Sequence, residues 1–130
     1  MKFSVRILTI LLLCLGLLAA TAVPAQAADK KGNYAIWGTG NESCHSYSQA
    51  RSSEADEPFR FYLMGYLTAF NVHQNDTYSI SGDLRLTDVL AWFDDYCGQH
   101  AVHGFELALK NFVGEYYQKR LQAMPTPYQR

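Results

Sequence analysis

Two cysteines limit what this chain can fold into more than any other feature. The sequence has three cysteines, Cys14, Cys44 and Cys97, and the first lies in an N-terminal segment that we expect to be removed. The remaining two are separated by 53 positions. An even number of cysteines in an exported chain indicates a disulfide, and two cysteines can be connected in one way. We therefore predict that Cys44 and Cys97 join two distant segments of one domain.

The first 27 residues have the layout of a secretory signal peptide. Lys2 and Arg6 are basic, a run of apolar residues follows, and Ala25 and Ala27 have the spacing of an A-x-A cleavage site. The apolar run is shorter than the ~20 residues that a membrane span needs. We expect cleavage after Ala27, a periplasmic or secreted location, and no membrane span in the mature chain, residues 28–130.

The mature chain has the length of a single domain. Loss of Lys2 and Arg6 leaves 9 basic and 12 acidic side chains, a net charge of −3. There is no basic stripe or tail of the kind that binds a phosphate backbone. We therefore expect no nucleic-acid partner.

Apolar residues recur at helical spacing in four segments, which predicts an all-α domain of four helices with its core at about residues 37–122. The first helix is short and follows a cap at Asn41 or Ser43. The second is the central helix and begins with Asp56 as its cap. Gly65, in the middle of this helix, predicts the close approach of a neighbouring helix.

The third and fourth predicted helices are amphipathic. The third starts at Asp83 or Thr87, and Gly98 is expected to end it in a left-handed conformation. The fourth covers roughly residues 102–122. The predicted disulfide would join the first helix to the third.

Aromatic residues are dense for a chain of this length, with 2 Trp, 9 Tyr and 7 Phe among 130 residues. Most of them suit the core, but so many also predict an exposed patch that binds a protein partner or a second copy of the chain. The residues that we assign to this predicted binding surface are Tyr62, Tyr66, Phe70, Tyr78 and Trp92.

The sequence gives little indication of catalysis. It contains no nucleophile elbow, phosphate-binding loop or haem-attachment motif. His100 and His103 form an H-x-x-H pair without further ligands, so we expect no metal, and nothing indicates a cofactor. Cys44, next to His45, is the rival candidate for a thiol nucleophile. We predict a non-enzymatic protein, and the alternative is a small hydrolase that uses His100, His103 or Asp94.

Four stretches of the sequence follow an order that is found in a known family. GTGNESCHSYSQAR carries one cysteine, MGYLTAFN lies in the central helix, WFDDYCGQH carries the other cysteine, and FELALKNFVGEY is the last helix. Together they cover most of residues 37–117 and resemble the small periplasmic proteins of the HdeA/HdeB kind. The resemblance implies a helical fold with one disulfide, here between Cys44 and Cys97, and a stress or chaperone-like function that offers apolar surface to unfolding proteins.

A second class of protein is similar in broader terms. Periplasmic immunity proteins that block effectors of type VI secretion also include small, helical, disulfide-linked chains. This similarity implies, as the alternative function, an inhibitor that binds one toxin tightly.

The predicted disulfide can be tested by counting thiols. Titration of the denatured, unreduced mature protein should find no free thiol, because export, cysteine count and helix positions all favour the bond. Two reactive thiols would contradict the prediction and would restore Cys44 as a candidate nucleophile.

Overall fold

The computed structural model describes residues 28–126, so the predicted signal peptide and the last residues of the chain lie outside the described part. The chain divides into two compact units, Met1–Ala35 and Ile36–Arg130. Every helix of the described residues belongs to the second unit. The account below therefore concerns that unit.

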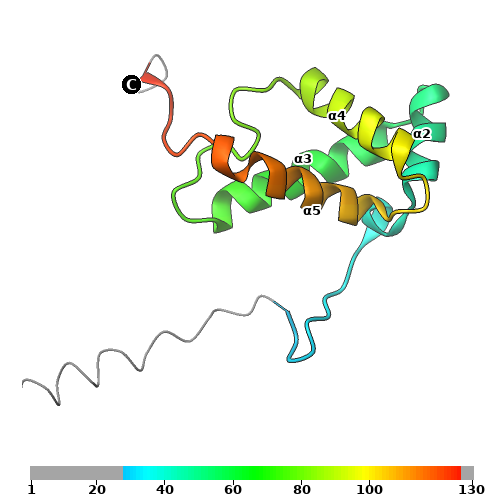
Figure 1. Cartoon of the computed structure of the whole chain (residues 1–130), viewed down its shortest axis with the longest axis horizontal. Coiled ribbons are helices and arrows are strands. Elements are labelled where there is room, and N and C mark those ends of the chain that lie inside the picture. The colour runs from blue at the N-terminus through cyan, green and yellow to red at the C-terminus, as the bar shows by residue number, and fades with distance from the viewer. Residues whose placement is uncertain (1–27, 127–130) are drawn as a thin grey trace, which may run out of the picture. The chain divides into compact units, whose positions relative to one another are not determined.

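Four α-helices and two short 3-10 helices form the second unit (Figure 1). In chain order they are η1 (Gly38–Asn41), α2 (Cys44–Ser52), α3 (Glu57–His73), α4 (Leu86–Gln99), α5 (Phe105–Tyr116) and η2 (Tyr117–Lys119). Residues 28–126 contain no β-strand, only two isolated bridges, between Ser43 and Gly104 and between Ser79 and Leu121. The prediction of an all-α domain with four helices is confirmed for this part of the chain.

The helices α2 and α3 begin differently. Ser43 caps α2 as predicted, because its hydroxyl oxygen accepts a hydrogen bond from the backbone N–H of Ser46 at 3.1 Å. Asp56 occupies the cap position of α3, but its side chain makes no capping hydrogen bond. Its carboxylate instead forms ion pairs with Arg51 and Arg60. The capping role predicted for the Asp56 side chain is therefore wrong, because the carboxylate faces two guanidinium groups, which both contact its Oδ2.

The helix α4 has different bounds from those predicted. It begins at Leu86, because the Asp88 carboxylate accepts a hydrogen bond from the backbone N–H of Arg85 at 3.1 Å and so completes the first turn. It then runs through Gly98, which was expected to end it in a left-handed conformation, to Gln99. A local capping hydrogen bond therefore sets the start of α4, and Gly98 lies inside the helix instead of ending it.

The helix α5 is shorter than the predicted segment at 102–122. It begins at Phe105, whose backbone N–H donates to the carbonyl oxygen of Glu42 at 2.7 Å. It ends at Tyr116, and after η2 the chain extends so that Leu121 pairs with Ser79. This loop pairing satisfies backbone groups that a further helical turn would otherwise satisfy.

The close approach predicted at Gly65 is wrong, and Gly40 provides one instead. A Cβ atom added at Gly65 would meet no neighbouring atom within 4 Å. A Cβ atom added at Gly40 would collide with the ring of Tyr62, so η1 packs directly on α3. The hydroxyl of Thr39 also donates to the carbonyl oxygen of Pro58 at 3.3 Å. The missing side chain at Gly65 leaves the outer surface of α3 open.

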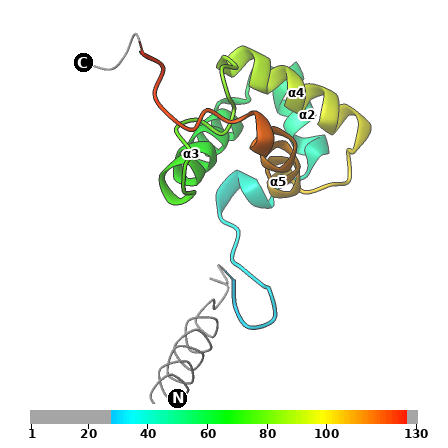
Figure 2. The ribbon, with the colours of Figure 1, turned by 60° about the vertical axis from the view of Figure 1, so that its left-hand side comes forward.

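Aromatic rings form the centre of the core. Phe105 contacts Tyr47, Phe59 and Phe93, with ring centroids 5.1, 5.0 and 5.5 Å apart. Phe112 continues the cluster at 5.5 Å from Phe93. Figure 2 shows that α2, α4 and α5 all lie to one side of α3, so only one face of α3 meets this core.

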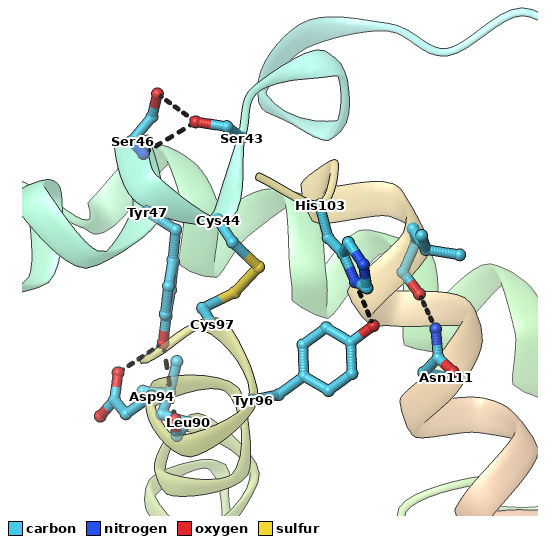
Figure 3. The surroundings of a disulfide bond; sticks show 11 residues. Ser43, Cys44, Ser46, Tyr47, Leu90, Asp94, Tyr96, Cys97, His103 and Asn111 are labelled. Atoms are coloured by element: carbon cyan, nitrogen blue, oxygen red, sulfur yellow. Dashed lines mark hydrogen bonds between the residues drawn. A yellow bond between two sulfur atoms is a disulfide. The ribbon is translucent and has the colours of Figure 1, made fainter. Parts of the chain in front are cut away.

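Cys44 and Cys97 lie at disulfide distance and connect α2 to α4 (Figure 3). Cys44 is the first residue of α2, Cys97 is near the end of α4, and their Cα atoms are 4.8 Å apart. The backbone N–H groups of Cys44 and His45 donate to the carbonyl oxygens of His103 and Ala101 at 2.8 and 2.9 Å. The disulfide and the turn between α4 and α5 therefore hold the same end of α2.

Two leucines provide a matched test of this core. Leu63 on α3 is completely buried, whereas Leu107 on α5 is 39% exposed. We expect Leu63→Ala to lower the free energy of unfolding by about 2–5 kcal/mol, and Leu107→Ala to lower it by much less. Urea denaturation measures both, and equal midpoints for the two variants would show that the buried face of α3 is assigned wrongly.

Candidate functional site

The outer face of α3 is apolar although it is exposed. Its members share one side of the helix and point away from the core: Pro58, Phe61, Gly65, Thr68, Ala69 and Val72. We call this set the α3 face. Phe61 is 60% exposed and Val72 is 72% exposed. The hydroxyl of Thr68 donates to the carbonyl oxygen of Met64 at 2.7 Å, so its hydrogen-bonding need is met within the helix.

The sequence of α3 explains why it has two apolar faces. Residues 61–72 include no charged side chain, and helical spacing places the α3 face within about 100° of the helix surface. Leu63 and Leu67 lie on the opposite side and are buried. A surface helix normally carries charged residues where it faces water, so an uncharged exposed face is typical of a surface that binds a partner.

An apolar groove adjoins the α3 face. Its apolar lining comes from α3, from α4 and from the loop between them: Leu63, Met64, Leu67, Leu84, Leu86 and Val89. Thr68, Asn71 and Ser81 form its polar rim. Asn71 fixes the loop side of the groove, because its side-chain oxygen accepts a hydrogen bond from the backbone N–H of Ile80 at 2.8 Å. Met64 and Thr68 make the groove continuous with the α3 face.

The residues assigned to a binding surface from the sequence are spread over several elements. Tyr62, Tyr66 and Phe70 lie on α3 but are half-buried against the core. Trp92 is half-buried on α4, where its indole N–H donates to the carboxylate of Glu115 on α5 at 2.9 Å. Tyr78 lies in the α3–α4 loop and is 43% exposed.

Sequence reasoning did not single out Phe61, Met64 or Val72. Helical periodicity identified the largest aromatic side chains of α3, and these side chains turn toward the core. The pattern that would have found the outer face is the absence of charge from residue 61 to residue 72. Such a run leaves no charged side of the helix for water, which is typical of a helix with apolar contacts on two sides.

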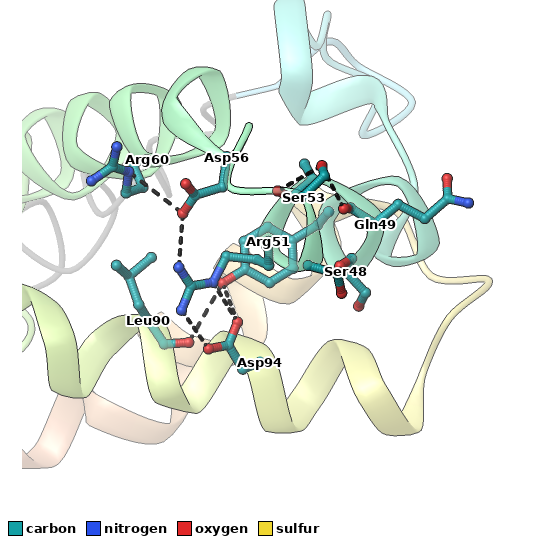
Figure 4. A network of polar contacts seen from close by, with 11 residues as sticks. Ser48, Gln49, Arg51, Ser53, Asp56, Arg60, Leu90 and Asp94 are labelled. Carbon is teal, nitrogen blue, oxygen red and sulfur yellow. Dashed lines mark hydrogen bonds and ion pairs between the residues drawn. The ribbon is translucent and has the colours of Figure 1, made fainter.

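A network of ionic contacts links α2, α3 and α4 (Figure 4). The Arg51 guanidinium holds the Asp94 carboxylate with two hydrogen bonds of 2.8 and 2.7 Å. It also donates to Asp56 at 2.9 Å, and Arg60 lies 3.5 Å from the same Asp56 oxygen. The Tyr47 hydroxyl donates to Asp94 at 2.8 Å. Both oxygens of Asp94, a residue of the hydrolase alternative, are therefore engaged in holding helices together.

These contacts shift the pKa values of the residues that make them. The hydrogen bonds from Arg51 lower the pKa of Asp94, and the hydrogen bond from Tyr47 acts in the same direction. The hydrogen bonds with Asp94 raise the pKa of Arg51. Burial, and then the hydrogen bond with Asp94, raise the pKa of the Tyr47 hydroxyl. At neutral pH Asp94 is therefore a carboxylate, Arg51 is a guanidinium cation and Tyr47 is a neutral phenol.

The two histidines of the H-x-x-H pair stack on each other. The rings of His100 and His103 are nearly parallel, with centroids 4.7 Å apart. Nδ1 of His103 lies 2.9 Å from the Tyr96 hydroxyl. Within residues 28–126, no group of three or more His, Cys, Asp or Glu side chains is arranged to hold a metal ion.

No family model, curated protein or solved structure matches the chain. Among the described helices, none is long and apolar enough to cross a membrane. The function is therefore inferred from the geometry of the site alone.

The Arg51–Asp94 contact predicts how stability depends on pH. Because the folded pKa of Asp94 lies below its unfolded value of about 3.9, the contact stabilises the fold above that value. The stabilisation disappears as pH falls through the folded pKa. We expect Asp94→Asn to unfold more easily at neutral pH and to lose less stability on acidification than the wild type.

Asp95 provides the control for this experiment. It is the neighbouring aspartate on α4 and lies outside the network, so Asp95→Asn should keep the pH dependence of the wild type. Thermal unfolding measured from about pH 7 to about pH 2 compares the variants across the range where carboxylates titrate. Identical pH profiles for Asp94→Asn and Asp95→Asn would contradict the role given to Asp94.

Proposed function

We propose that this protein is an exported, non-enzymatic protein-binding domain, and that the α3 face with its adjoining groove is its binding surface. The observation that carries the proposal is the uncharged, exposed side of α3, where Phe61 and Val72 are mostly accessible to water. Burial of apolar surface contributes ~25 cal/mol per Å², so such a face favours association.

The form of the surface supports a helical or extended apolar segment as its ligand. An uncharged helix face next to an apolar groove suits an amphipathic helix, whose side chains at successive turns would lie along α3 and enter the groove. The rim residues Asn71 and Ser81 offer polar groups at the edge, as is usual at protein interfaces. The surface has no cationic cluster that would favour a nucleic acid.

Export is supported by the N-terminal sequence and by the cysteines. Residues 1–27 have the pattern of a signal peptide with cleavage after Ala27. Cys44 and Cys97 lie at disulfide distance, and a structural disulfide is favoured in an oxidising compartment such as the periplasm. We therefore place the mature protein in the periplasm or outside the cell.

Within this class, the proposed role is stress-related or chaperone-like, as in proteins of the HdeA/HdeB kind. The α3 face supports it, because an apolar face on a disulfide-linked scaffold can bind unfolding proteins without specific polar contacts. The alternative is an immunity-type inhibitor. It is supported by the exposure of the face in the folded domain, which lets a folded partner bind without any opening.

Two valines provide a matched pair for testing the surface. Val72 on the α3 face is 72% exposed, and Val102 in the α4–α5 turn is 92% exposed. We expect the wild type and Val102→Lys to suppress aggregation of heat-unfolded citrate synthase, and Val72→Lys and Phe61→Lys to lose most of this protection. The reason is that a buried, unpaired ammonium would oppose binding at the α3 face. Light scattering at neutral and acidic pH measures the effect.

The outcomes separate the hypotheses. Equal protection by all variants would show that the α3 face is not the binding surface. No protection by the wild type at either pH would remove the chaperone-like role. In that case, a tight complex with one toxin that Val72→Lys weakens and Val102→Lys does not would support the inhibitor.

A further inference from the structure

A second groove, which we call the α4–α5 groove, lies between α4 and α5 and shares no lining residue with the α3 face. Its α4 wall is aromatic, because Trp92 and Tyr96 are one helical turn apart and both line it. Its α5 wall is formed by residues on successive turns: Leu107, Lys110, Asn111, Gly114 and Glu115. The groove has a volume of about 520 Å³, which lies within the usual range of small-molecule sites, about 300–1,000 Å³.

Contacts from three parts of the fold hold the aromatic wall in place. The rings of Trp92 and Tyr96 stack on each other, with centroids 5.0 Å apart and an angle of 12° between the ring planes. The Trp92 ring also packs edge-on against Phe112 at 5.2 Å, and its indole N–H donates to Glu115 at 2.9 Å. The Tyr96 hydroxyl lies 2.9 Å from Nδ1 of His103 (Figure 3). Rings that are fixed in advance lose little side-chain freedom when a ligand binds.

The α5 wall places polar groups of different kinds next to these rings. Lys110 carries an ammonium group and Glu115 a carboxylate, so both signs of charge line one groove. The side-chain N–H of Asn111 donates to the carbonyl oxygen of Leu107 at 2.8 Å, which fixes the orientation of its amide. A cationic or an anionic ligand would meet a like charge in this groove. A neutral ligand that carries many hydroxyl groups can use donors and acceptors together, since a hydroxyl group is both.

We propose that the α4–α5 groove binds a short, neutral oligosaccharide whose rings lie on Trp92 and Tyr96. Sugar rings carry C–H groups on their faces and hydroxyl groups around their rims, so the faces match the aromatic wall and the rims match the polar wall. The α5 wall extends from Leu107 to Gly114, ~10 Å of helix, which suits a short chain. A β-1,4-linked chain is flat, so its successive rings can contact one wall. This inference is independent of the proposed function, because it concerns another surface and another ligand.

Gly114 leaves space in the groove and provides the test position. A Cβ atom there would meet nothing within 4 Å, so a larger side chain would occupy the groove without disturbing the core. Gly98 is the matched control, since it is also helical and also has no atom within 4 Å of an added Cβ. It lies beside Arg51 and Asp94, on another side of α4. Both Gly114→Leu and Gly98→Leu should fold, because leucine is more favourable than glycine inside a helix.

Tryptophan fluorescence measures binding at this groove. The mature chain has two tryptophans, so Trp37→Phe leaves Trp92 as the only reporter. Trp37 is 79% exposed, and its replacement should not disturb the core. The titrants are cellotetraose and chitotetraose, which are flat β-1,4-linked chains, and maltotetraose, which joins the same glucose units as cellotetraose into a curved chain. We expect a saturable change in Trp92 emission with a flat chain and weaker binding of maltotetraose.

In the Trp37→Phe background, we expect Gly114→Leu to raise the Kd for the flat chain at least about tenfold and Gly98→Leu to leave it within about twofold. Asn111→Ala, which removes a polar group without filling the groove, should also weaken binding. Thermal unfolding checks that each variant is folded. An absence of saturable binding by both flat chains, equal weakening by the two leucine variants, or equal affinity for maltotetraose would overturn the inference.

Discussion

The connection between α2 and α4 is the constraint on which the rest of the fold depends. The helix α2 has 9 residues, which is too short to be stable alone, so tertiary contacts must hold it. The disulfide joins Cys44, in the first turn of α2, to Cys97 on α4, and Arg51 in the last turn of α2 binds Asp94. A disulfide that closes a loop of this length stabilises a domain by about 4 kcal/mol in the chain-entropy model. With α2 fixed at both ends, Tyr47 can stack on Phe105 at the centre of the core.

This arrangement leaves α3 at the edge of the domain. The aromatic core lies between α3 and the other α-helices, and α3 meets it with one side only. The opposite side has the same apolar character but faces water, with Phe61 and Val72 exposed. The scaffold therefore presents an exposed apolar helix face, and the position of α3 is fixed by the Arg51–Asp56 ion pair and by the hydrogen bond from Ile80 to Asn71. Because the surface is already exposed, it can bind a protein without a conformational change.

Periodicity and cysteine count were enough to predict four helices and the cysteine pair, because both depend on local pattern and on chain connectivity. The helix ends were harder to predict, since tertiary hydrogen bonds decide them: Phe105 begins α5 by donating to Glu42, and Leu121 leaves the helical path to pair with Ser79. The candidate surface was missed for a different reason. Periodicity identified the inward side of α3, so Phe61 on the opposite side was overlooked although the lack of charge around it was visible.

The central claim is that the α3 face becomes covered when the protein binds. Relaxation of the methyl protons of Val72 and Val102 by a soluble paramagnetic agent measures this directly, first in dilute free protein and then with a bound client. Both methyl groups should relax strongly in the free, dilute protein. On binding, Val72 should become protected while Val102 stays accessible. Equal protection of the two valines, or protection of Val102 alone, would contradict the account.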